Sequence, residues 1–220
     1  MGWGLLSLSM PSQRPMNRMS ISVLGCTMFP DVSLVQVTRE DVQRMRGWLN
    51  DPEVNTMWYG SDDDGFPLHL GYSPHTILES SHDEWQATFV SEVRKIFSVY
   101  SAYGEHIGEG QLAIEWPLME CQLVLIVGRK DLWHHHYGTM ALVKFLDEAF
   151  SVQGLHRVWV DVPEYNEHAL RMFRHVGFVL EGHMRKTHRK DGEWYDSYAM
   201  GLLVDEYSRR RARLMGTAAV

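Results

Sequence analysis

Cysteine is scarce in this sequence, which has two cysteines among 220 residues. Cys26 and Cys121 lie far apart, and neither belongs to a CxxC pair. The chain therefore offers no disulfide framework and no cysteine-based zinc site, and we expect no bound metal. Reduced thiols are typical of the cytoplasm, so a cytoplasmic location is the expectation.

Long apolar runs and an excess of basic residues are also missing. The mildly apolar segment 1–10 is too short to span a bilayer and has no basic region before it, so we expect no membrane partner. Lys and Arg number 21 against 28 Asp and Glu, which gives a formal net charge of −7. Nucleic-acid-binding surfaces need concentrated positive charge, and the one basic run, residues 209–213, has the character of a solvated C-terminal tail. Nucleic acid is therefore not an expected partner.

The composition that is present is that of a globular protein, with 45% apolar and 22% charged residues. This length and composition predict one domain with one sizeable core. Pro, Ser, Arg and Asn crowd residues 11–20, so residues 1–30 are expected to form a mobile N-terminal extension. We place the folded domain at residues 31–207 and a C-terminal tail at residues 208–220.

Hydrophobic periodicity and cap signals divide the domain into helices and strands. Thr38 and Ser81 are expected to cap two helices, and Glu84 completes a capping-box pattern with Ser81. Asp191-Gly192 is a strong signal for a hairpin turn. The expected elements, in chain order, are a strand at 32–37, a helix that Asp51-Pro52 stops, a helix from 81, three strands at 95–102, 107–115 and 121–128, a helix from 139, a strand at 157–162, a helix at 166–175, and two strands at 178–189 and 194–203.

Residues 55–80, between the first two helices, are rich in Gly, Pro, Asp and aromatic residues and predict a long irregular loop. Such a length is unusual for a connection without secondary structure, so the loop is a candidate substrate-facing segment. The alternative is a surface loop whose aromatic side chains pack onto the core. Its Asp62-Asp63-Asp64 triplet either attracts a cationic amine by its negative charge or is a solvated stretch of the loop.

Residues 127–139 join an apolar strand to an amphipathic helix through a tight polar turn. The first N–H groups of a helix have no partner within the helix, and together with the helix dipole they form a ready site for an anion. The sequence therefore predicts a pyrophosphate-binding turn at the start of this helix.

The order of the elements and several motifs resemble the GNAT superfamily of N-acetyltransferases, and most of all its ribosomal-protein N-terminal and polyamine acetyltransferase branch. The resemblance covers residues 32–207 and implies a mixed α/β (α+β) fold with a mostly antiparallel central sheet flanked by helices. The matching residues are the strand 121–128, the Trp-His-His-His-Tyr-Gly-Thr sequence at 133–139 where the family has W-G-K-G-Y-G-T, and Asn166, Ala169, Gly177 and Phe178 of an N-x-x-A-x-x-x-Y-x-x-x-G-F pattern.

The resemblance implies that acetyl-CoA is the acyl donor and that an amine of a small molecule or a peptide is the acceptor. In the family the pantetheine arm pairs with the strand that matches residues 125–127, and the pyrophosphate meets the next helix. Asn166 resembles the residue that binds the CoA arm; its other interpretation is an N-cap for the helix it begins. Family members often pair through their sheets, which makes a homodimer a further expectation. The implied CoA-binding residues are Ile126, Val127, Gly128, Trp133, His134, His135, His136, Tyr137, Gly138, Thr139 and Asn166.

Three positions depart from the family pattern. Gln122 stands where the family has a strand glutamate, so Glu120, two residues earlier on the same strand face, is the candidate general base, with a plain surface carboxylate as the alternative. Phe173 stands where a tyrosine often protonates the leaving thiolate. The run His134–His136 replaces two glycines and a basic residue, which adds side chains where the backbone should approach the pyrophosphate.

The histidine run has three interpretations. Partly protonated imidazoles, together with Arg129 and Lys130, would add positive charge for the diphosphate. A shared metal site is the second interpretation, although three consecutive side chains point in different directions. The third is a set of solvent-exposed residues that the turn tolerates.

Two hypotheses of function follow. The leading one is an acyl-CoA-dependent N-acyltransferase that moves acetyl from acetyl-CoA to a primary amine by direct transfer in a ternary complex. Asn166 and the Tyr137-Gly138-Thr139 turn favour it. The alternative is a catalytically degenerate GNAT-like module that binds acyl-CoA or a protein partner without turnover, which the three departures favour.

Overall fold

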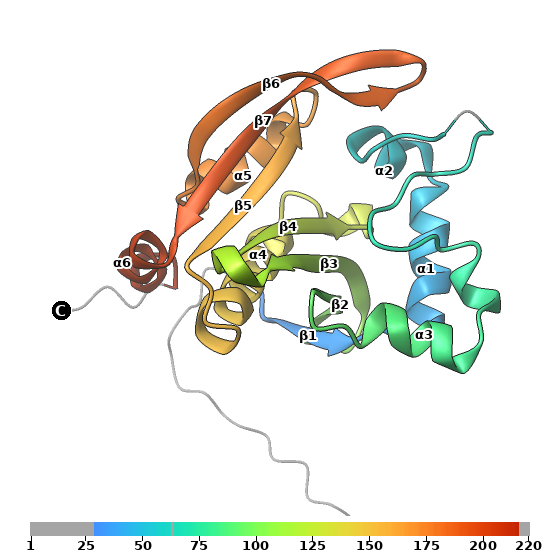
Figure 1. Ribbon diagram of the computed structural model, residues 1–220, viewed down its shortest axis with the longest axis horizontal. Coiled ribbons are helices and arrows are strands. Elements are labelled where there is room, and N and C mark those ends of the chain that lie inside the picture. The colour runs from blue at the N-terminus through green and yellow to red at the C-terminus, as the bar shows by residue number, and fades with distance from the viewer. Residues whose placement is uncertain (1–28, 63, 216–220) are drawn as a thin grey trace, which may run out of the picture.

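The computed structural model describes residues 29–62 and 64–215. Within this part of the chain the strands are β1 (Val32–Gln36), β2 (Arg94–Ser101), β3 (His106–Glu115), β4 (Glu120–Val127), β5 (Arg157–Pro163), β6 (Val179–Lys190) and β7 (Glu193–Leu203). They form one sheet in the order β1-β2-β3-β4-β5-β7-β6 (Figure 1). Each neighbouring pair is antiparallel except β4 and β5, which run parallel.

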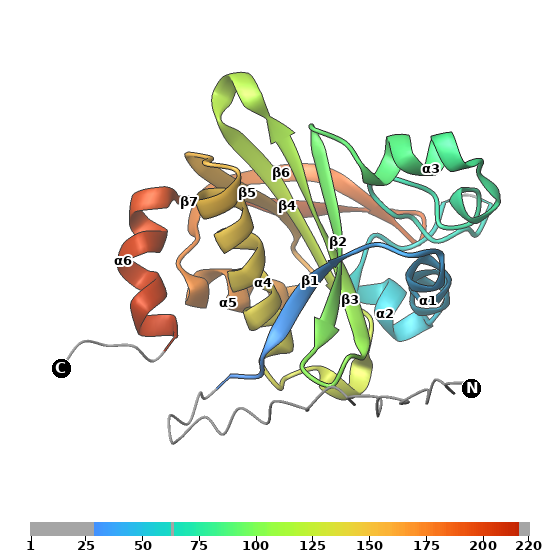
Figure 2. The ribbon, with the colours of Figure 1, turned by 90° about the horizontal axis from the view of Figure 1, so that it is seen from below.

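Helices cover both faces of the sheet. The α-helices are α1 (Arg39–Leu49), α2 (Pro52–Met57), α3 (His82–Phe89), α4 (Tyr137–Asp147), α5 (Glu167–Val176) and α6 (Val204–Leu214), and the shorter helical segments are η1 (Ile77–Glu79), η2 (Trp116–Leu118), η3 (Lys130–Leu132) and the π-helical η4 (Glu148–Val152). Figure 2 shows α4, α5 and α6 grouped apart from α1, α2 and α3. The predicted fold class, a mostly antiparallel central sheet flanked by helices, is confirmed.

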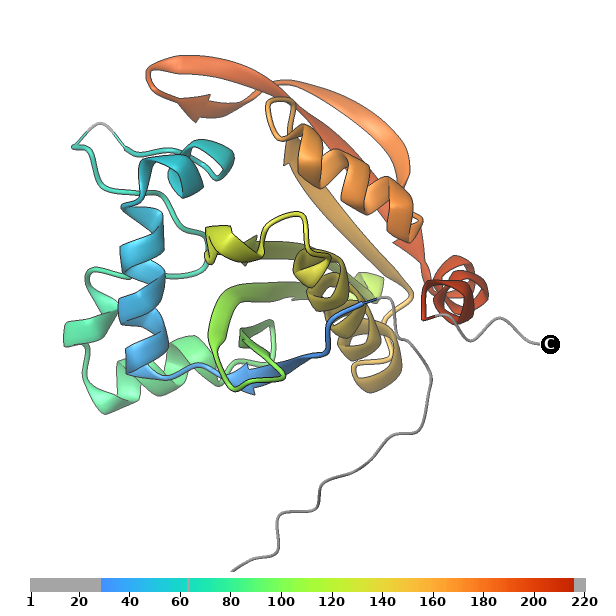
Figure 3. The same ribbon diagram turned by 180° about the vertical axis from the view of Figure 1, so that it is seen from behind.

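The main core lies between the sheet and α4. Leu142, Phe145 and Leu146 of this helix are fully buried among strand residues. A Cβ atom on Gly110 of β3 would lie 2.3 Å from the Phe145 ring, so glycine at this position is what allows α4 to approach the sheet. Helix α5 packs on the same side, as Figure 3 shows, and adds Leu170 to this core.

The opposite face of β4 packs against α1. Met45 and Leu49 of α1 form one cluster with Val124 and Ile126 of β4. The intervening residue Leu125 belongs to the α4 side, as the alternation of a strand requires. Strand β4 is therefore covered on both faces, and its backbone reaches a ligand only along its edge.

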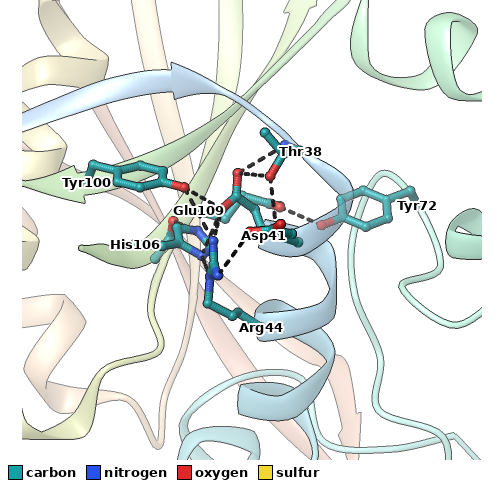
Figure 4. A network of polar contacts seen from close by, with 9 residues as sticks. Thr38, Asp41, Arg44, Tyr72, Tyr100, His106 and Glu109 are labelled. Atoms are coloured by element: carbon teal, nitrogen blue, oxygen red, sulfur yellow. Dashed lines mark hydrogen bonds and ion pairs between the residues drawn. The ribbon is translucent and has the colours of Figure 1, made fainter. Parts of the chain in front are cut away.

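A buried carboxylate ties the start of α1 to β2 and β3 (Figure 4). Asp41 is 1% exposed and accepts hydrogen bonds from Tyr100 Oη at 2.6 Å and Arg44 Nη2 at 2.9 Å. It also accepts the backbone N–H of Thr38 at 3.0 Å, which completes a capping box. Burial alone would raise the pKa of Asp41, but the hydrogen bonds from these three residues outweigh it and lower the pKa to about 2.

Most sequence predictions of secondary structure are confirmed. Thr38 and Ser81 cap α1 and α3, and the Ser81–Glu84 capping box is present. The three-strand meander and the closing hairpin form as expected. Asp191 and Gly192 at the hairpin turn have φ of 53° and 80°, the left-handed pair that a two-residue hairpin turn requires.

Helix α2 was not predicted. The Asp51-Pro52 pair was expected to end the preceding helix, but Asp51 caps a new helix by accepting the N–H of Glu53 at 2.9 Å. Proline is favoured at the first position of a helix, where its missing N–H costs nothing. The expected loop at residues 55–80 therefore begins only after Met57 and contains the short segment η1.

The prediction of a solvated tail from residue 208 is wrong for residues 208–214, which belong to α6. Tyr207 and Leu214 lie on one face of this helix and are buried. Arg211 pairs with Asp147 of α4 at 2.6 Å, and Arg210 donates to the carbonyl of His175 at 3.0 Å. The basic run thus lies on a packed helix, because two apolar residues spaced by two turns supply its buried face.

The predicted extension at residues 1–30 lies outside the described residues except for its last two positions. In residues 29–62 and 64–215, no helix has the length and apolar character needed to cross a membrane.

We expect Asp41→Asn to lower the free energy of unfolding at neutral pH by about 2 kcal/mol, because the shift of the Asp41 pKa from its usual value measures the stabilisation of its charged form. That contribution is present above the unfolded-state pKa and is lost as the pH falls toward 2. Urea unfolding at pH 7 and pH 3 measures both effects. Asp83→Asn, at an exposed position of α3, is the control; an Asp41→Asn protein as stable as the wild type at pH 7 would contradict the prediction.

Candidate active site

The ladder between β4 and β5 ends early. Glu120, Cys121 and Gln122 pair with residues 157–159 of β5, and the two strands then diverge (Figure 1). On its other edge β4 stays paired with β3 up to Val127. Residues 123–127 of β4 therefore have one backbone edge without a strand partner, which can pair with an extended ligand as an added strand would.

A groove of about 580 Å³ opens along this free edge. It runs between α2 on one side and α5 on the other, and the start of α4 forms one end. The residues that line it are Glu53, Val54, Met57, Trp58, Leu125, Ile126, Val127, Leu132, Trp133, His134, His136, Gly138, Thr139, Asn166, His168, Ala169 and Met172.

The first turn of α4 faces this groove through Gly138 and Thr139. The N–H groups of the first residues of a helix have no acceptor within the helix, so they form a site for an anionic group. The turn before α4 is held in an uncommon conformation, because His134 and His136 have φ of 64° and 63°. Histidine tolerates the left-handed region poorly, at a cost of roughly 1 kcal/mol per residue, whereas glycine adopts it freely.

Three consecutive carbonyls at the end of α2 are held by side chains from the other half of the sheet. Lys190 Nζ donates to the carbonyl of Thr56 at 2.8 Å, Asn166 Nδ2 to that of Met57 at 2.9 Å, and Tyr165 Oη to that of Trp58 at 2.7 Å. These last carbonyls have no partner within the helix, so the three donors complete its C-terminus. Together with the packing of Val54 against α1 and β4, these three contacts hold α2 beside the groove.

The groove brings together most of the predicted CoA-binding residues. Three of them do not line it. Gly128 lies against Trp48, where an added Cβ would meet the indole at 2.0 Å. His135 is exposed, and Tyr137 packs against the main core.

Sequence reasoning missed the contribution of α2 and most of α5. Glu53, Val54 and Met57 escaped because α2 was not predicted. His168 and Met172 of α5 carry no motif of their own. The only available signal was that His168 and Met172 share one helix face at i and i+4, and that Met172 lies three residues after Ala169 of the motif.

A family model described as an acetyltransferase (GNAT) domain matches residues 31–179. The chain belongs to the GNAT acetyltransferase family. Spermidine N(1)-acetyltransferase of Vibrio cholerae serotype O1 is 31% identical over 181 residues, which cover 81% of this chain and 96% of that protein. The uncharacterised N-acetyltransferase YnaD of Bacillus subtilis is 26% identical over 109 residues, which cover 50% of this chain and 56% of that protein.

Solved structures share the fold. The crystal structure of spermidine N-acetyltransferase from Vibrio cholerae in complex with CoA and spermine has a TM-score of 0.67 at 20% identity and covers 80% of this chain and 98% of that chain. A dodecameric structure of spermidine N-acetyltransferase from the same organism has a TM-score of 0.64 at 20% identity and covers 81% of this chain and 97% of that chain. This GNAT acetyltransferase is therefore an enzyme that moves acetyl from acetyl-CoA to an amine.

The groove fits the acyl donor that the family uses. Pantetheine is a chain of amides, and the free edge of residues 123–127 offers backbone groups spaced for such a chain. The first turn of α4 is suited to the pyrophosphate. Trp133 donates its indole N–H to the carbonyl of Val127 at 2.8 Å, which fixes the end of β4 where the two binding regions meet.

Asn166 satisfies both interpretations drawn from the sequence. It lines the groove and also caps α5, because its Oδ1 accepts the N–H of Ala169 at 3.1 Å. Its Nδ2 donates to Met57 of α2. Nδ2 carries two N–H donors and the contact with Met57 uses one of them, so the other can be donated to CoA.

The predicted general base lies away from the groove. Glu120 is at the opposite end of β4 from Val127, in an ion pair with Arg157 that also includes Glu181. Its side chain is on the same strand face as Gln122, as expected. The assignment of Glu120 as the base receives no support from this placement, because Arg157 already neutralises its charge.

Phe173 offers no general acid at the position where the family often has a tyrosine. Phe173 is buried against Phe178 and has no hydroxyl with which to protonate a thiolate.

Arg129 and Lys130, expected to add charge for the diphosphate, are paired within the protein. Lys130 contacts Asp51 and Glu53 at 2.8 and 2.9 Å, and these hydrogen bonds raise the pKa of Lys130. Both cations are therefore engaged by acidic side chains and are not available to pair with the diphosphate of CoA.

The histidine run does not gather into a metal site. The His134 ring packs against the His168 ring of α5, with the two ring centroids 4.7 Å apart, whereas the His136 ring packs against the Phe29 ring. In the described part of the chain, no group of three or more His, Cys, Asp or Glu is placed to hold a metal ion.

We expect His136→Gly to bind acetyl-CoA several-fold more tightly than the wild type, because glycine adopts the left-handed φ without strain and removes an imidazole from the groove wall. Calorimetric titration with acetyl-CoA measures the change. His135→Gly alters an exposed neighbour that does not line the groove and should leave the Kd unchanged. Weaker binding by His136→Gly would instead mean that the imidazole contacts the diphosphate.

Two substitutions of Asn166 separate its structural and ligand-binding roles. Asn166→Ala removes the cap of α5 and should lower the free energy of unfolding by about 1 kcal/mol. Asn166→Asp keeps the cap acceptor of α5 but loses the amide donor to Met57 and to a ligand, so it should lower the free energy of unfolding by about 1 kcal/mol through α2 and raise the Kd for acetyl-CoA by about two- to tenfold, the worth of one hydrogen bond in each case. Denaturant unfolding and calorimetry distinguish the two. Wild-type binding by both variants would leave Asn166 with only its structural contacts to α5 and α2.

Proposed function

We propose that this GNAT acetyltransferase acetylates a primary amine of a polyamine by direct attack on acetyl-CoA within a ternary complex. The observation that carries the proposal is the free edge of β4, which leads from the helix N-terminus of α4 into the sheet gap. That arrangement leaves one face of the donor open to a second substrate.

The choice of a polyamine rests on the relatives. The Vibrio cholerae relative at 31% identity is named for spermidine, and a structural neighbour was solved with spermine. The net charge of −7 suits a polycationic acceptor, because opposite charge raises the rate of encounter. Within the acidic triplet, Asp62 accepts the N–H groups of Asp64 and Phe66 and so organises its own turn. Asp63 lies outside the described residues.

The surroundings of Cys121 support direct transfer over a covalent acetyl-enzyme. Cys121 is the cysteine within the described residues, and it is fully buried in the main core. Burial, with a smaller contribution from the charge of Glu120, raises the pKa of its thiol to about 12. A thiol that is neutral at pH 7 and closed off from the groove is unsuited to carry the acetyl group.

The test is an assay of thiol release from acetyl-CoA with spermidine, spermine and a peptide with a free N-terminus. We expect polyamine-dependent release, an acetylated polyamine by mass spectrometry, and intersecting initial-rate lines for the two substrates. A fully N-methylated polyamine, which cannot be acetylated, is the control. Release with the peptide alone would overturn the polyamine assignment, and acetyl-CoA binding without release for any amine would overturn turnover itself.

A further inference from the structure

A histidine from α5 meets the turn before α4 at one end of the groove. The rings of His168 and His134 lie with their centroids 4.7 Å apart, and both residues line the groove. His168 is in the first turn of α5, whereas His134 precedes His136, the N-cap of α4, by two residues. The contact therefore brings the His168 imidazole to the end of the groove where the first N–H groups of α4 are suited to the pyrophosphate.

This end of the groove lacks a free basic side chain for a diphosphate. Among the described residues that line the groove there is no Lys or Arg. Arg129 and Lys130, close by in the chain, are engaged by acidic side chains. A diphosphate presents more acceptor sites than the N–H groups of one helix turn satisfy, so a donor from a side chain strengthens its binding. The imidazoles that line the groove are those of His134, His136 and His168.

Arg171 fixes which nitrogen of His168 is the donor. Arg171 Nη2 lies 3.3 Å from His168 Nδ1. A guanidinium only donates, so Nδ1 accepts, and the neutral imidazole carries its proton on Nε2. Arg171 is itself held by Glu167 at 2.9 Å, and neither of these two residues lines the groove. The Nδ1 contact therefore lies outside the groove, and Nε2–H is a donor without a hydrogen-bond partner in the part of the chain that the structure describes.

The start of α5 is fixed by contacts on both sides of His168. The side chain of Asn166 accepts the N–H of Ala169 at 3.1 Å and donates to the carbonyl of Met57 of α2 at 2.9 Å. The first turn of α5 is therefore capped and tied to the opposite wall of the groove. A donor on such a turn is already in place before the ligand arrives, so its hydrogen bond costs little ordering of the chain.

We propose that His168 Nε2 donates a hydrogen bond to the diphosphate of acetyl-CoA beside the first turn of α4, and that Arg171 is the positioning residue that keeps the ring proton on Nε2. The proposal rests on acetyl-CoA as the acyl donor. It names a binding residue on α5 at a position that the N-x-x-A motif leaves open. No acceptor takes part in this contact, so its test is independent of the polyamine assignment.

The test compares His168→Leu with a matched control on the same helix, by calorimetric titration with CoA. We expect His168→Leu to raise the Kd by about tenfold, the effect of losing one hydrogen bond to a charged group. His168→Gln keeps an N–H donor near the place of Nε2 and should stay within about threefold of the wild type. His175→Leu alters an exposed histidine in the last turn of α5, outside the groove, and should leave the Kd unchanged. A wild-type Kd in His168→Leu would overturn the proposal.

Truncated ligands show which part of CoA the imidazole contacts. Dephospho-CoA keeps the diphosphate and lacks the 3′-phosphate, so His168→Leu should weaken its binding by the same factor as that of CoA. S-acetylpantetheine has no phosphate and should compete with CoA equally well in His168→Leu and in the wild type. A loss of affinity for CoA alone would place the contact at the 3′-phosphate, and an equal loss for S-acetylpantetheine would reveal a disturbed groove. Either result would overturn the proposal.

A double-mutant cycle tests the positioning role of Arg171. Arg171→Met removes the donor to Nδ1, so the ring proton is free to move to Nδ1, and the Kd for CoA should rise by about two- to threefold. The same substitution in the His168→Leu protein should have no further effect, because Arg171 acts through the imidazole. Equal effects in the two proteins would mean that the guanidinium acts on CoA directly, which would overturn the positioning role. Failure to acetylate any polyamine would refute the acceptor assignment, whereas the Kd differences would still support the His168 contact.

Discussion

The early end of the β4–β5 ladder is the constraint on which the rest of the site depends. Three residue pairs hold the strands together, and beyond Gln122 and Trp159 the strands diverge (Figure 1). The divergence gives β4 an unpaired edge in the middle of a sheet, where edges are normally avoided. The groove and the opening of the first turn of α4 onto it follow from this edge, because both lie beside it.

The sequence predicted the sheet well, since strand alternation and turn residues are local signals. It failed where one local signal has two meanings. Asp51-Pro52 ends one helix and begins the next, and only the packing of Val54 against α1 and β4 decides between a loop and α2. The basic residues 209–213 predicted a tail, and the burial of Tyr207 against α4 outweighs that pattern. In both cases tertiary contacts override composition.

The candidate site was likewise predictable only where its signals are local in the sequence. The turn before α4 was predictable because a strand, a polar turn and a helix follow one another in the chain. The sequence predicts Glu120 as the general base from its strand face and its distance from Gln122. It does not show that Arg157, from another strand, forms an ion pair with Glu120 and neutralises its charge.

The three side chains that complete the end of α2 also act as a mechanical link. Lys190, Asn166 and Tyr165 belong to the half of the sheet that contains β5, β6 and β7, whereas α2 follows α1 on the half that contains β4. The two halves of the sheet, which three β4–β5 residue pairs and the core under α4 already join, are thus connected again across the open end. Because these contacts hold α2 at a fixed distance from α5, they also set the width of the groove between the two helices.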